Sequence, residues 1–368
     1  MSDQINQVKE LERQLMLARA NVLADQEKLE KYAANSKPSV MAVGIGGAGC
    51  NIISWVKDEG VTGGRLISVN TDAVHLTISK ADNRILIGEN TCKGLGCGGY
   101  AKVGEVAMHE SIEEVFTEVG NSNILFLIAG LGGGTGTGGI VQLAKELKAK
   151  FENDPVPRLL VGVATLPFQI ETARMKAAKS AIQELKQYCD TVVIIDNDRL
   201  NHIAGNLPFK EALGVANTTI GKFVKGVTET ITCASLINLD YADLRTIMHE
   251  AGIASIGIGQ GFGEGKVEHA VERALNERLL DVEDITKAKG VLIHISGGED
   301  MTLEEVHRGG ELIKRYMPPN SPVIWGAKVD PELEGKANVM VVITGVDSAF
   351  LKAQKKKSAT GRFKLPWK

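Results

Sequence analysis

The feature that most constrains this chain is a glycine-rich loop between a predicted strand and a predicted helix. The apolar run 123–129 predicts a buried strand, the segment 132–139 holds six glycines and two threonines, and a helical pattern begins at Ile140. Glycine lets a ligand approach the backbone, and a helix N-terminus directs N–H donors and a positive dipole end at it. The segment therefore predicts a phosphate site, and its regular apolar flanks argue against a flexible linker.

A second glycine-rich turn, residues 44–49, has the G-x-G-x-x-G spacing of a dinucleotide fingerprint and precedes a helix expected from about Ile52. A dinucleotide site also needs a ribose-binding carboxylate about 20 residues further on. The predicted strand 65–70 ends in Asn70 instead, and Asp72 lies beyond that spacing. A tight turn that binds no ligand is the alternative for this motif.

A third glycine cluster, residues 94–99, precedes a helix expected over 102–119. Three such loops in one half of the chain suggest that they enclose a phosphate chain from several sides. The loop 132–139 contains no lysine, which argues against a Walker A motif. Backbone N–H groups and a metal ion would then neutralise the phosphate charge.

The composition is that of a globular protein with a large core. The chain has 368 residues, of which 43% are hydrophobic and 24% charged, which favours two domains. A formal net charge of -3 predicts no nucleic-acid partner. No apolar run reaches the roughly 18–20 residues of a membrane span and no signal peptide is evident, so we expect a cytoplasmic location. Five cysteines without metal-type spacing, at positions 50, 92, 97, 189 and 233, predict reduced thiols and no metal-ligand set.

Two motifs that contain acidic residues can be explained either by a functional role or by a structural role such as helix capping. Glu171 and Arg174 start a helix after the predicted strand 159–165, where they can bind a sugar or phosphate, or form a cap and a surface ion pair. Asp240 and Asp243 start another helix, and such residues commonly serve as helix caps.

The second half of the chain begins with a long helical pattern and continues as an α+β layer with a mixed sheet. The helix is expected over 208–237, would span roughly 40 Å, and carries Asn217 in its first part. The following strand-helix-strand-helix-strand-strand elements are expected at 255–258, 266–280, 290–296, 302–317, 322–329 and 338–345.

Both ends of the chain are polar. Residues 3–33 carry an apolar residue at every seventh position from Val8 to Leu29, which predicts either a pairing helix or an extension that docks on its own domain. The tail after Val346 holds seven lysines and arginines. It predicts a disordered tail, or a docking peptide for an acidic partner or an anionic membrane surface.

Together these motifs resemble the tubulin/FtsZ superfamily and, within it, the FtsZ branch. The similarity covers about residues 38–346 without large gaps, and the form of the first loop looks archaeal. The segments that carry it are Gly46-Gly47-Ala48-Gly49-Cys50-Asn51, Asn70-Thr71-Asp72-Ala73, Gly94-Leu95-Gly96, Gly133-Gly134-Thr135-Gly136-Thr137-Gly138, Asn197-Asp198-Arg199-Leu200 and Asn238-Leu239-Asp240-Tyr241-Ala242-Asp243.

The resemblance implies an α/β fold with a Rossmann-like GTP-binding domain, a long central helix and an α+β second domain with a mixed sheet. The implied parts are an N-terminal helical extension at 1–37, the GTP-binding domain at 38–204, the central helix at 205–237, a C-terminal GTPase-activating domain at 238–346 and the basic tail at 347–368.

The resemblance also implies a site for GTP or GDP with Mg²⁺. It assigns the α- and β-phosphates to Gly47, Ala48, Gly49, Cys50 and Asn51. It assigns the phosphate chain to the signature loop, chiefly Gly134, Thr135 and Gly136 with Gly133, Thr137 and Gly138 beside them. It assigns the γ-phosphate to Cys97, Gly98 and Gly99, the ribose to Glu171 with Arg174 nearby, and guanine to Asn197 and Asn217. Asn70 and Asp72 belong to the same nucleotide-binding set.

Asp240, Asp243 and Asn238 look like the catalytic loop that enters the nucleotide site of the next subunit. This arrangement implies a homopolymer assembled head to tail, with hydrolysis coupled to filament formation. The implied role is a cell-division GTPase, at the division site.

Several residues depart from the family pattern. Glu171 and Arg174 are one residue closer than usual, Thr218 stands where an acid is usual, Leu213 where an aromatic often stacks on the base, and Tyr100-Ala101 where Asn-Pro is usual. Two alternatives therefore stay open: a divergent FtsZ-like scaffold or cell-shape protein with weak GTPase activity, and an NAD(P)-dependent oxidoreductase.

Overall fold

The computed structural model describes residues 38–120, 122–152, 154–232, 240–280, 282, 285–319 and 321–347. The predicted heptad helix, the tail beyond residue 347, Cys233 and Asn238 lie outside the described residues, so the predictions made for them stay predictions.

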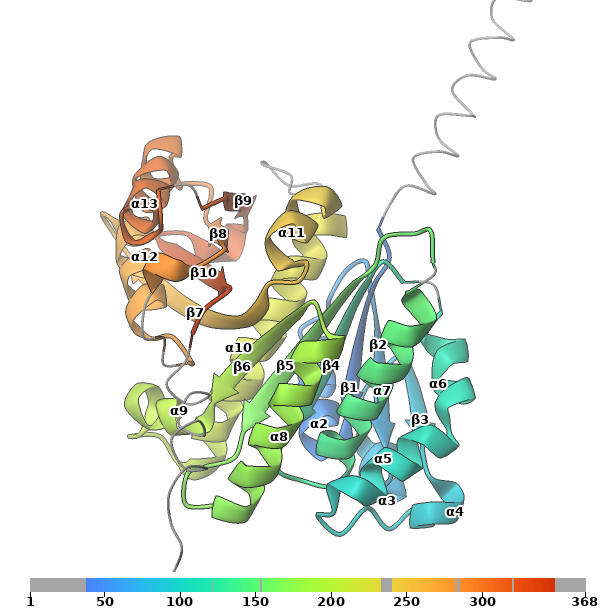
Figure 1. Ribbon diagram of the computed structural model, residues 1–368. Coiled ribbons are helices and arrows are strands. Elements are labelled where there is room, and N and C mark those ends of the chain that lie inside the picture. The colour runs from blue at the N-terminus through green and yellow to red at the C-terminus, as the bar shows by residue number, and fades with distance from the viewer. Residues whose placement is uncertain are drawn as a thin grey trace, which may run out of the picture. The chain divides into compact units, whose positions relative to one another are not determined.

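The strands of the described residues form one ten-stranded sheet (Figure 1). They are β1 (Val40–Ile45), β2 (Gly64–Asn70), β3 (Asn83–Leu86), β4 (Ile124–Gly130), β5 (Leu159–Leu166), β6 (Thr191–Asp196), β7 (Gly252–Phe262), β8 (Gly290–Gly297), β9 (Val323–Val329) and β10 (Lys336–Thr344). Their order across the sheet is β3-β2-β1-β4-β5-β6-β7-β10-β8-β9. Strands β1 to β6 are parallel in doubly wound order, whereas β10 runs antiparallel to β7 and β8. The predicted fold class, α/β with a mixed sheet in the second half, is confirmed.

Helices cover both faces of this sheet. They are α2 (Gly46–Asp58), α3 (Ala73–Ile78), α4 (Glu89–Cys92), α5 (Ala101–Glu110), α6 (Ile112–Val119), α7 (Thr135–Phe151), α8 (Thr172–Tyr188), α9 (Asn197–Ala204), α10 (Phe209–Thr232), α11 (Tyr241–Met248), α12 (Lys266–Asn276) and α13 (Leu303–Tyr316). None of the described helices combines the length and apolar character needed to cross a membrane.

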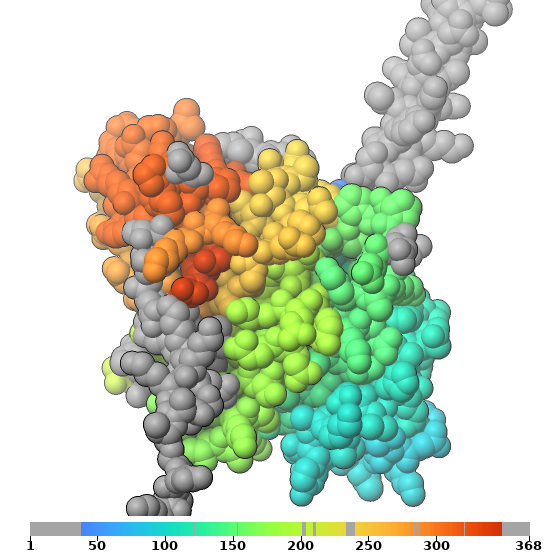
Figure 2. Space-filling model, viewed as in Figure 1, coloured from blue at the N-terminus to red at the C-terminus, as the bar shows by residue number. Residues whose placement is uncertain are grey.

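Each face of the sheet has its own apolar core. One core joins Met41, Val43 and Ile45 to the buried sides of α5 to α8, α12 and α13. The other joins Val40 and Ala42 to α2, α10 and α11. Alternate residues of β1 enter different cores because successive side chains of a strand point to opposite faces. In Figure 2, seen from the first of these faces, the covering helices hide most of the strands.

The sheet is continuous between the two halves of the chain. Strands β6 and β7 pair in parallel from Thr191 opposite Gly252 to Val193 opposite Ala254. The long helix α10 crosses the other face and packs on both halves through residues such as Phe223 and Val227. The halves are therefore joined by a short backbone ladder as well as by the predicted long helix, which within the described residues ends at Thr232.

Two helices begin earlier than the apolar pattern predicts. Helix α2 starts at Gly46 and not near Ile52, and α7 starts at Thr135 and not at Ile140. The glycine-rich turns themselves form the first helical residues, so apolar periodicity begins only after the helix has started.

The helix predicted over 102–119 is two helices that meet at Ser111. The Ser111 hydroxyl accepts a hydrogen bond from the backbone N–H of Gly88, at 3.1 Å. This contact with the segment after β3 accompanies the break, and an apolar pattern alone does not reveal it.

Strand β7 continues through the glycines that were expected to follow it, so the predicted end at Ile258 is wrong. A Cβ placed on Gly257, Gly259 or Gly261 would lie 1.8 to 1.9 Å from a backbone oxygen of α12. The three glycines therefore let the helix backbone lie directly against the strand.

We expect Gly259→Ala to lower the free energy of unfolding by about 2 kcal/mol or more, because overpacking forces the backbone apart. Denaturant titration measures it. Gly310→Ala is the matched control, since a Cβ there meets no atom within 4 Å and the residue lies inside α13. That control should be neutral or stabilising by up to ~1 kcal/mol. Equal effects of the two substitutions would contradict the close contact.

His294 of β8 lies where α10 packs on the second half of the sheet. Its Nδ1 is 2.9 Å from the hydroxyl of Thr230 on α10, and its Nε2 is 3.1 Å from the hydroxyl of Ser296. Burial, and secondarily the charge of Lys328, lowers the pKa of His294 from 6.5 to about 4, while Glu229 acts in the opposite direction.

This lowered pKa predicts a loss of stability in mild acid. Below pH 6.5 the unfolded chain takes up a proton that folded His294 does not bind until about pH 4. The contribution of neutral His294 to the free energy of unfolding is thus complete above pH 6.5. It falls by about 2–3 kcal/mol as the pH drops from 6.5 to 4. Denaturant titrations across this range should show a smaller pH dependence for His294→Gln. The same slope in both proteins would refute the assignment.

Candidate functional site

A cavity of about 310 Å³ lies at the carboxyl ends of β1, β4, β5 and β6. Helix α2, after β1, and helix α7, after β4, pack on opposite faces of the sheet, so the boundary between these strands is a topological switch point. Ligands of doubly wound sheets bind at such points. The cavity is lined by Ile45, Gly47, Ala48, Gly130, Leu131, Gly133, Gly134, Thr135, Gly136, Thr165, Leu166, Pro167, Glu171, Arg174 and Asn197.

The three glycine-rich loops touch one another at this cavity. A Cβ on Gly46 would lie 2.8 Å from the backbone nitrogen of Gly136, and one on Gly134 would lie 2.5 Å from Cβ of Cys97. A Cβ on Gly133 would instead meet no protein atom within 4 Å. The loops are thus closed against each other and open toward the cavity, where the first N–H groups of α2 and α7 can receive an anion.

Two hydroxyls and a thiol connect these loops. The Thr135 hydroxyl donates to Sγ of Cys97 at 3.3 Å and lies 2.6 Å from the hydroxyl of Thr71. The Thr71 hydroxyl is 3.4 Å from the same sulfur, and Sγ of Cys92 lies 3.5 Å from Sγ of Cys97. All four side chains are buried. Sequence reasoning did not single out Thr71, although its place in the Asn-Thr-Asp motif is a usable signal.

Glu171 and Arg174 form the predicted ion pair, whereas the Glu171 side chain makes no capping hydrogen bond at the start of α8. Nη1 of Arg174 donates to Oε2 of Glu171 at 2.6 Å, and Oε1 of Glu171 accepts from the backbone N–H of Phe168 at 3.2 Å. Both side chains also line the cavity. Arg174 supplies the positive charge among the described lining residues, and its largely exposed guanidinium can reorient toward an anion.

Asn197 presents a polar atom without a partner. It is the first residue of α9, and its Oδ1 is enclosed and makes no hydrogen bond within the described part of the chain. A buried acceptor without a donor costs free energy, so this atom fits a ligand that brings an N–H group. The side-chain amide carries both an NH₂ donor group and a carbonyl acceptor, which complement the donors and the acceptor on the edge of guanine.

Other predicted phosphate residues lie near the cavity but do not line it. A Cβ on Gly49 would meet the backbone oxygen of Ile128 at 2.4 Å, so this glycine packs α2 on β4. The side chain of Cys50 is buried away from solvent, and burial raises its pKa to about 11. Asn51 is exposed on α2.

The remaining predicted residues shape the loops. Oδ1 of Asn70 accepts from the N–H of Thr71 at 2.9 Å, and Oδ1 of Asp72 accepts from the N–H of His75 at 3.0 Å. The Thr137 hydroxyl accepts from the N–H of Gly132 at 2.8 Å. Gly138 packs on α5, while Gly98 and Gly99 form the turn before it with positive φ.

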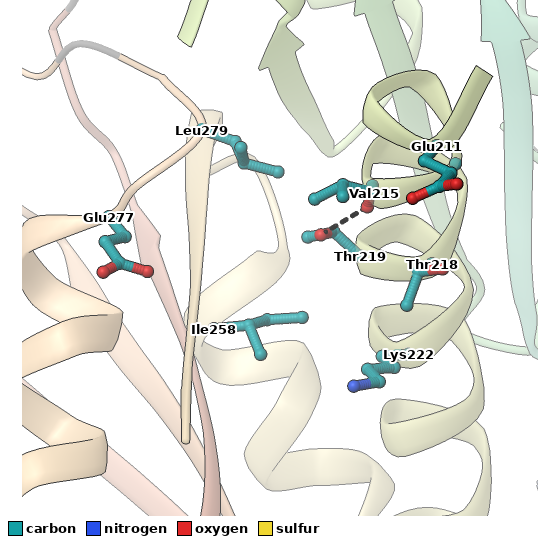
Figure 3. A pocket seen from close by; sticks show the side chains of 9 residues that line it. Glu211, Val215, Thr218, Thr219, Lys222, Ile258, Glu277 and Leu279 are labelled. Carbon is teal, nitrogen blue, oxygen red and sulfur yellow. Dashed lines mark hydrogen bonds between the residues drawn. The ribbon is translucent and has the colours of Figure 1, made fainter. Parts of the chain in front are cut away.

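Asn217 on α10 is not among the residues that line the cavity. On the same helix, Thr218 and Lys222 face a second cavity of about 390 Å³, whose far wall carries Ile258 of β7 (Figure 3). Leu213 borders a third, separate hollow with Phe168. The structure therefore does not bring Asn217 together with Asn197 around the cavity.

Asp240 and Asp243 lie at the other end of the sheet. The hydroxyl of Tyr241, between them, donates to the backbone oxygens of Pro157 at 2.7 Å and Asn123 at 3.3 Å, which precede β5 and β4. Tyr241 is therefore anchored at the amino ends of β4 and β5, and the carboxyl ends of these strands border the cavity. The seven residues of β4 separate its two ends by about 20 Å. Both aspartates are exposed, and Asp240 also caps α11 by accepting from the N–H of Asp243 at 2.7 Å.

No cluster of three or more His, Cys, Asp or Glu residues is placed to hold a metal ion in the described part of the chain. The cavity lining contributes one carboxylate, Glu171, which is paired with Arg174. Mg²⁺ is commonly held by substrate phosphates and water with few protein ligands. The lining therefore fits a metal that is bound chiefly through a polyphosphate.

Two family models match the chain. The model for the GTPase domain of the tubulin/FtsZ family matches residues 39–205, and the model for the C-terminal domain of the FtsZ family matches residues 252–347. The chain is 44% identical over 328 residues to cell division protein FtsZ 1 of Methanocaldococcus jannaschii, covering 88% of this chain and 87% of that protein. The chain belongs to the tubulin/FtsZ family.

Solved structures agree with this assignment. The empty FtsZ dimer of M. jannaschii superposes with a TM-score of 0.80 at 43% identity, covering 87% of this chain and 92% of that one. A GTPγS-bound protofilament of CetZ2 from Haloferax volcanii, at 22% identity and a TM-score of 0.71, shares the fold over 86% of this chain and 97% of that one. The predicted family and its GTPase activity are thus confirmed, and the NAD(P)-dependent oxidoreductase is set aside.

The open space beside Gly133 predicts a substitution that separates binding from folding. We expect Gly133→Ala to leave the melting temperature unchanged and to weaken GTP binding at least about tenfold, or about 1.4 kcal/mol, because its methyl group occupies ligand space. Gly310→Ala is the control for both measurements. Unchanged GTP affinity would show that the ligand does not contact this part of the loop.

Proposed function

We propose that this chain hydrolyses GTP in filaments, at sites completed by two molecules. The observation that carries the proposal is the separation of the cavity from the exposed acids Asp240 and Asp243, which lie at opposite ends of the same parallel strands. One molecule does not bring the two together. A second copy, stacked head to tail, places the acids of one molecule at the cavity of the next, and this heterologous contact repeats as an open filament.

The cavity binds the nucleotide in this proposal. Backbone N–H groups of the loops at Gly47 and Gly134 receive the phosphates, and Glu171 with Arg174 faces the ribose and phosphate chain. Asn197 pairs with guanine through its free amide oxygen. Asn217 is not among the residues that line the cavity, so its assigned role in guanine binding stays a prediction.

The acids act on water. Carboxylates of Asp240 and Asp243 accept hydrogen bonds from the attacking water and orient it toward the γ-phosphate of the neighbouring molecule. Mg²⁺, bound through the phosphates, supplies charge neutralisation. Asn238 is proposed to contact the same nucleotide and lies outside the described residues.

The cellular role follows from the relatives. Proteins 41–44% identical to this chain are named cell division protein FtsZ, and one solved relative is a dimer. On this basis we assign the chain to cell division, as a self-assembling protein of the cytoplasm that works at the division site. An acidic partner or an anionic membrane is proposed for the basic tail.

Removing the acids should abolish hydrolysis and keep binding. Asp240→Asn retains an oxygen that can cap α11, so the expected loss of GTP turnover does not come from a frayed helix. Asp243→Asn should behave alike, with turnover reduced by about 100-fold or more. GTP affinity, measured by titration, stays at the wild-type value. Lost binding in both variants would contradict the role given to the acids.

A mixture of two impaired variants, at a GTP concentration too low to saturate Gly133→Ala, tests the shared site directly. Gly133→Ala keeps the acids but binds GTP poorly, whereas Asp243→Asn binds GTP but lacks one acid. If one molecule acts on the nucleotide of the next, mixing them restores turnover, and turnover per molecule rises steeply with concentration. Turnover that is independent of concentration, with no restoration in the mixture, would refute the shared site.

A scaffold with weak turnover is the second candidate. Leu213, where the family often has an aromatic residue, borders a hollow separate from the nucleotide cavity and supplies no ring for stacking. This candidate predicts filaments with GTP but little hydrolysis in the wild-type chain, and the same turnover in Asp243→Asn.

A further inference from the structure

We propose that Cys92 and Cys97 are an oxidation-sensitive thiol pair, which hydrogen peroxide converts into a disulfide that slows nucleotide turnover. The modification itself stands on the geometry of the two thiols. Its effect on turnover also rests on the proposed function, because the pair adjoins the loops assigned to the phosphates.

The two sulfur atoms are already in contact. They are 3.5 Å apart, and the side chains are 6% and 7% exposed. A disulfide brings sulfur atoms to about 2.05 Å, so each needs to move less than about 1 Å.

The segment between the two cysteines can make this movement. Lys93, Gly94 and Gly96 have positive φ, as do the two glycines after Cys97. Leu95, at the tip, is 86% exposed. The two thiols thus flank a short loop whose tip is exposed, and in this proposal peroxide reaches them when that loop is displaced.

Neighbouring groups define the order of the chemical steps. The Thr135 hydroxyl donates to Sγ of Cys97 at 3.3 Å, and in the proposed order this sulfur, on the side of the nucleotide loop, reacts first. Burial, together with the adjacent Cys97, raises the pKa of Cys92 to about 11, which suits it to the second, slower step.

The reaction balances with peroxide as the oxidant. The Cys97 thiolate attacks one peroxide oxygen, an S–O bond forms, the O–O bond breaks, and hydroxide leaves and is protonated to water. Sγ of Cys92 then attacks the sulfenic sulfur, the S–S bond forms, the S–O bond breaks, and a second water leaves. Two electrons pass from the two sulfur atoms to peroxide.

The disulfide changes the contacts of the nucleotide loop. Sγ of Cys97 turns toward Cys92 and away from Thr135, the first residue of α7 and part of the cavity lining. The same segment is tied to the end of β2 by backbone hydrogen bonds from Gly96 to Thr71 and from Ala73 to Gly94. The new bond therefore alters contacts of two of the three glycine-rich loops, 94–99 and 132–139.

Peptide mapping of the full-length protein tests the modification. Trypsin cuts after Lys93 and so separates residues 85–93 from residues 94–102, each with one cysteine. After peroxide treatment and alkylation of free thiols, the two peptides should appear joined in the wild-type protein and in Cys189→Ser, and separate in Cys92→Ser. Peptides oxidised independently, or alkylated at both positions in the treated wild type, would overturn the pair.

GTP turnover of the same samples tests the consequence. Turnover of the wild-type protein and Cys189→Ser should fall about fivefold or more with peroxide and recover with dithiothreitol, whereas that of Cys92→Ser should hardly change. A linked peptide pair with unchanged turnover would overturn the control of the nucleotide loop. A reduced protein without turnover at any concentration would refute the proposed function instead, and the peptide map would still decide the fate of the thiols.

Discussion

The direction of the parallel strands is the constraint on which the rest of this structure depends. Because β1, β4, β5 and β6 run the same way, the turns that follow them meet at one edge of the sheet. The loops before β4 and β5 meet at the other edge, where Tyr241 is anchored. The glycine-rich loops that line the cavity and the exposed acids are thereby separated by about the length of a strand, as a direct result of the strand direction.

Glycine serves close approach in two different ways in this fold. At the cavity, Gly46 and Gly134 let separate loops touch, so that N–H groups converge on one place. In β7, the alternating glycines bring the backbone of α12 onto the strand and leave no room for a ligand. Glycine content alone does not distinguish these uses, but the alternate spacing in β7 and the clustered spacing at 132–139 do.

The sequence predicted most of the buried strands and the glycine-rich turns that follow them, because both are local patterns. It placed the starts of α2 and α7 too late, since glycine carries no apolar signal, and it ended β7 too early for the same reason. The pairing of β6 with β7 depends on how segments distant in the sequence pack, and the contact of Cys92 with Cys97 depends on the conformation of the loop between them. The spacing of residues in the sequence reveals neither. For Asp240, the sequence predicted a helix cap, and the resemblance to the family implied a catalytic role. The structure shows that Asp240 caps α11 and that its side chain is exposed.

The position of Tyr241 has a consequence for the ends of an assembly. Its hydroxyl fixes the acidic turn to the edge of the sheet opposite the cavity. In the proposed head-to-tail filament, each molecule therefore has one end that carries the acids and one end that carries the cavity. A row of n molecules then contains n − 1 joined pairs, and one terminal molecule always holds a nucleotide that no neighbour reaches. The two tips of such a row differ in chemical state, even though every molecule in it is identical.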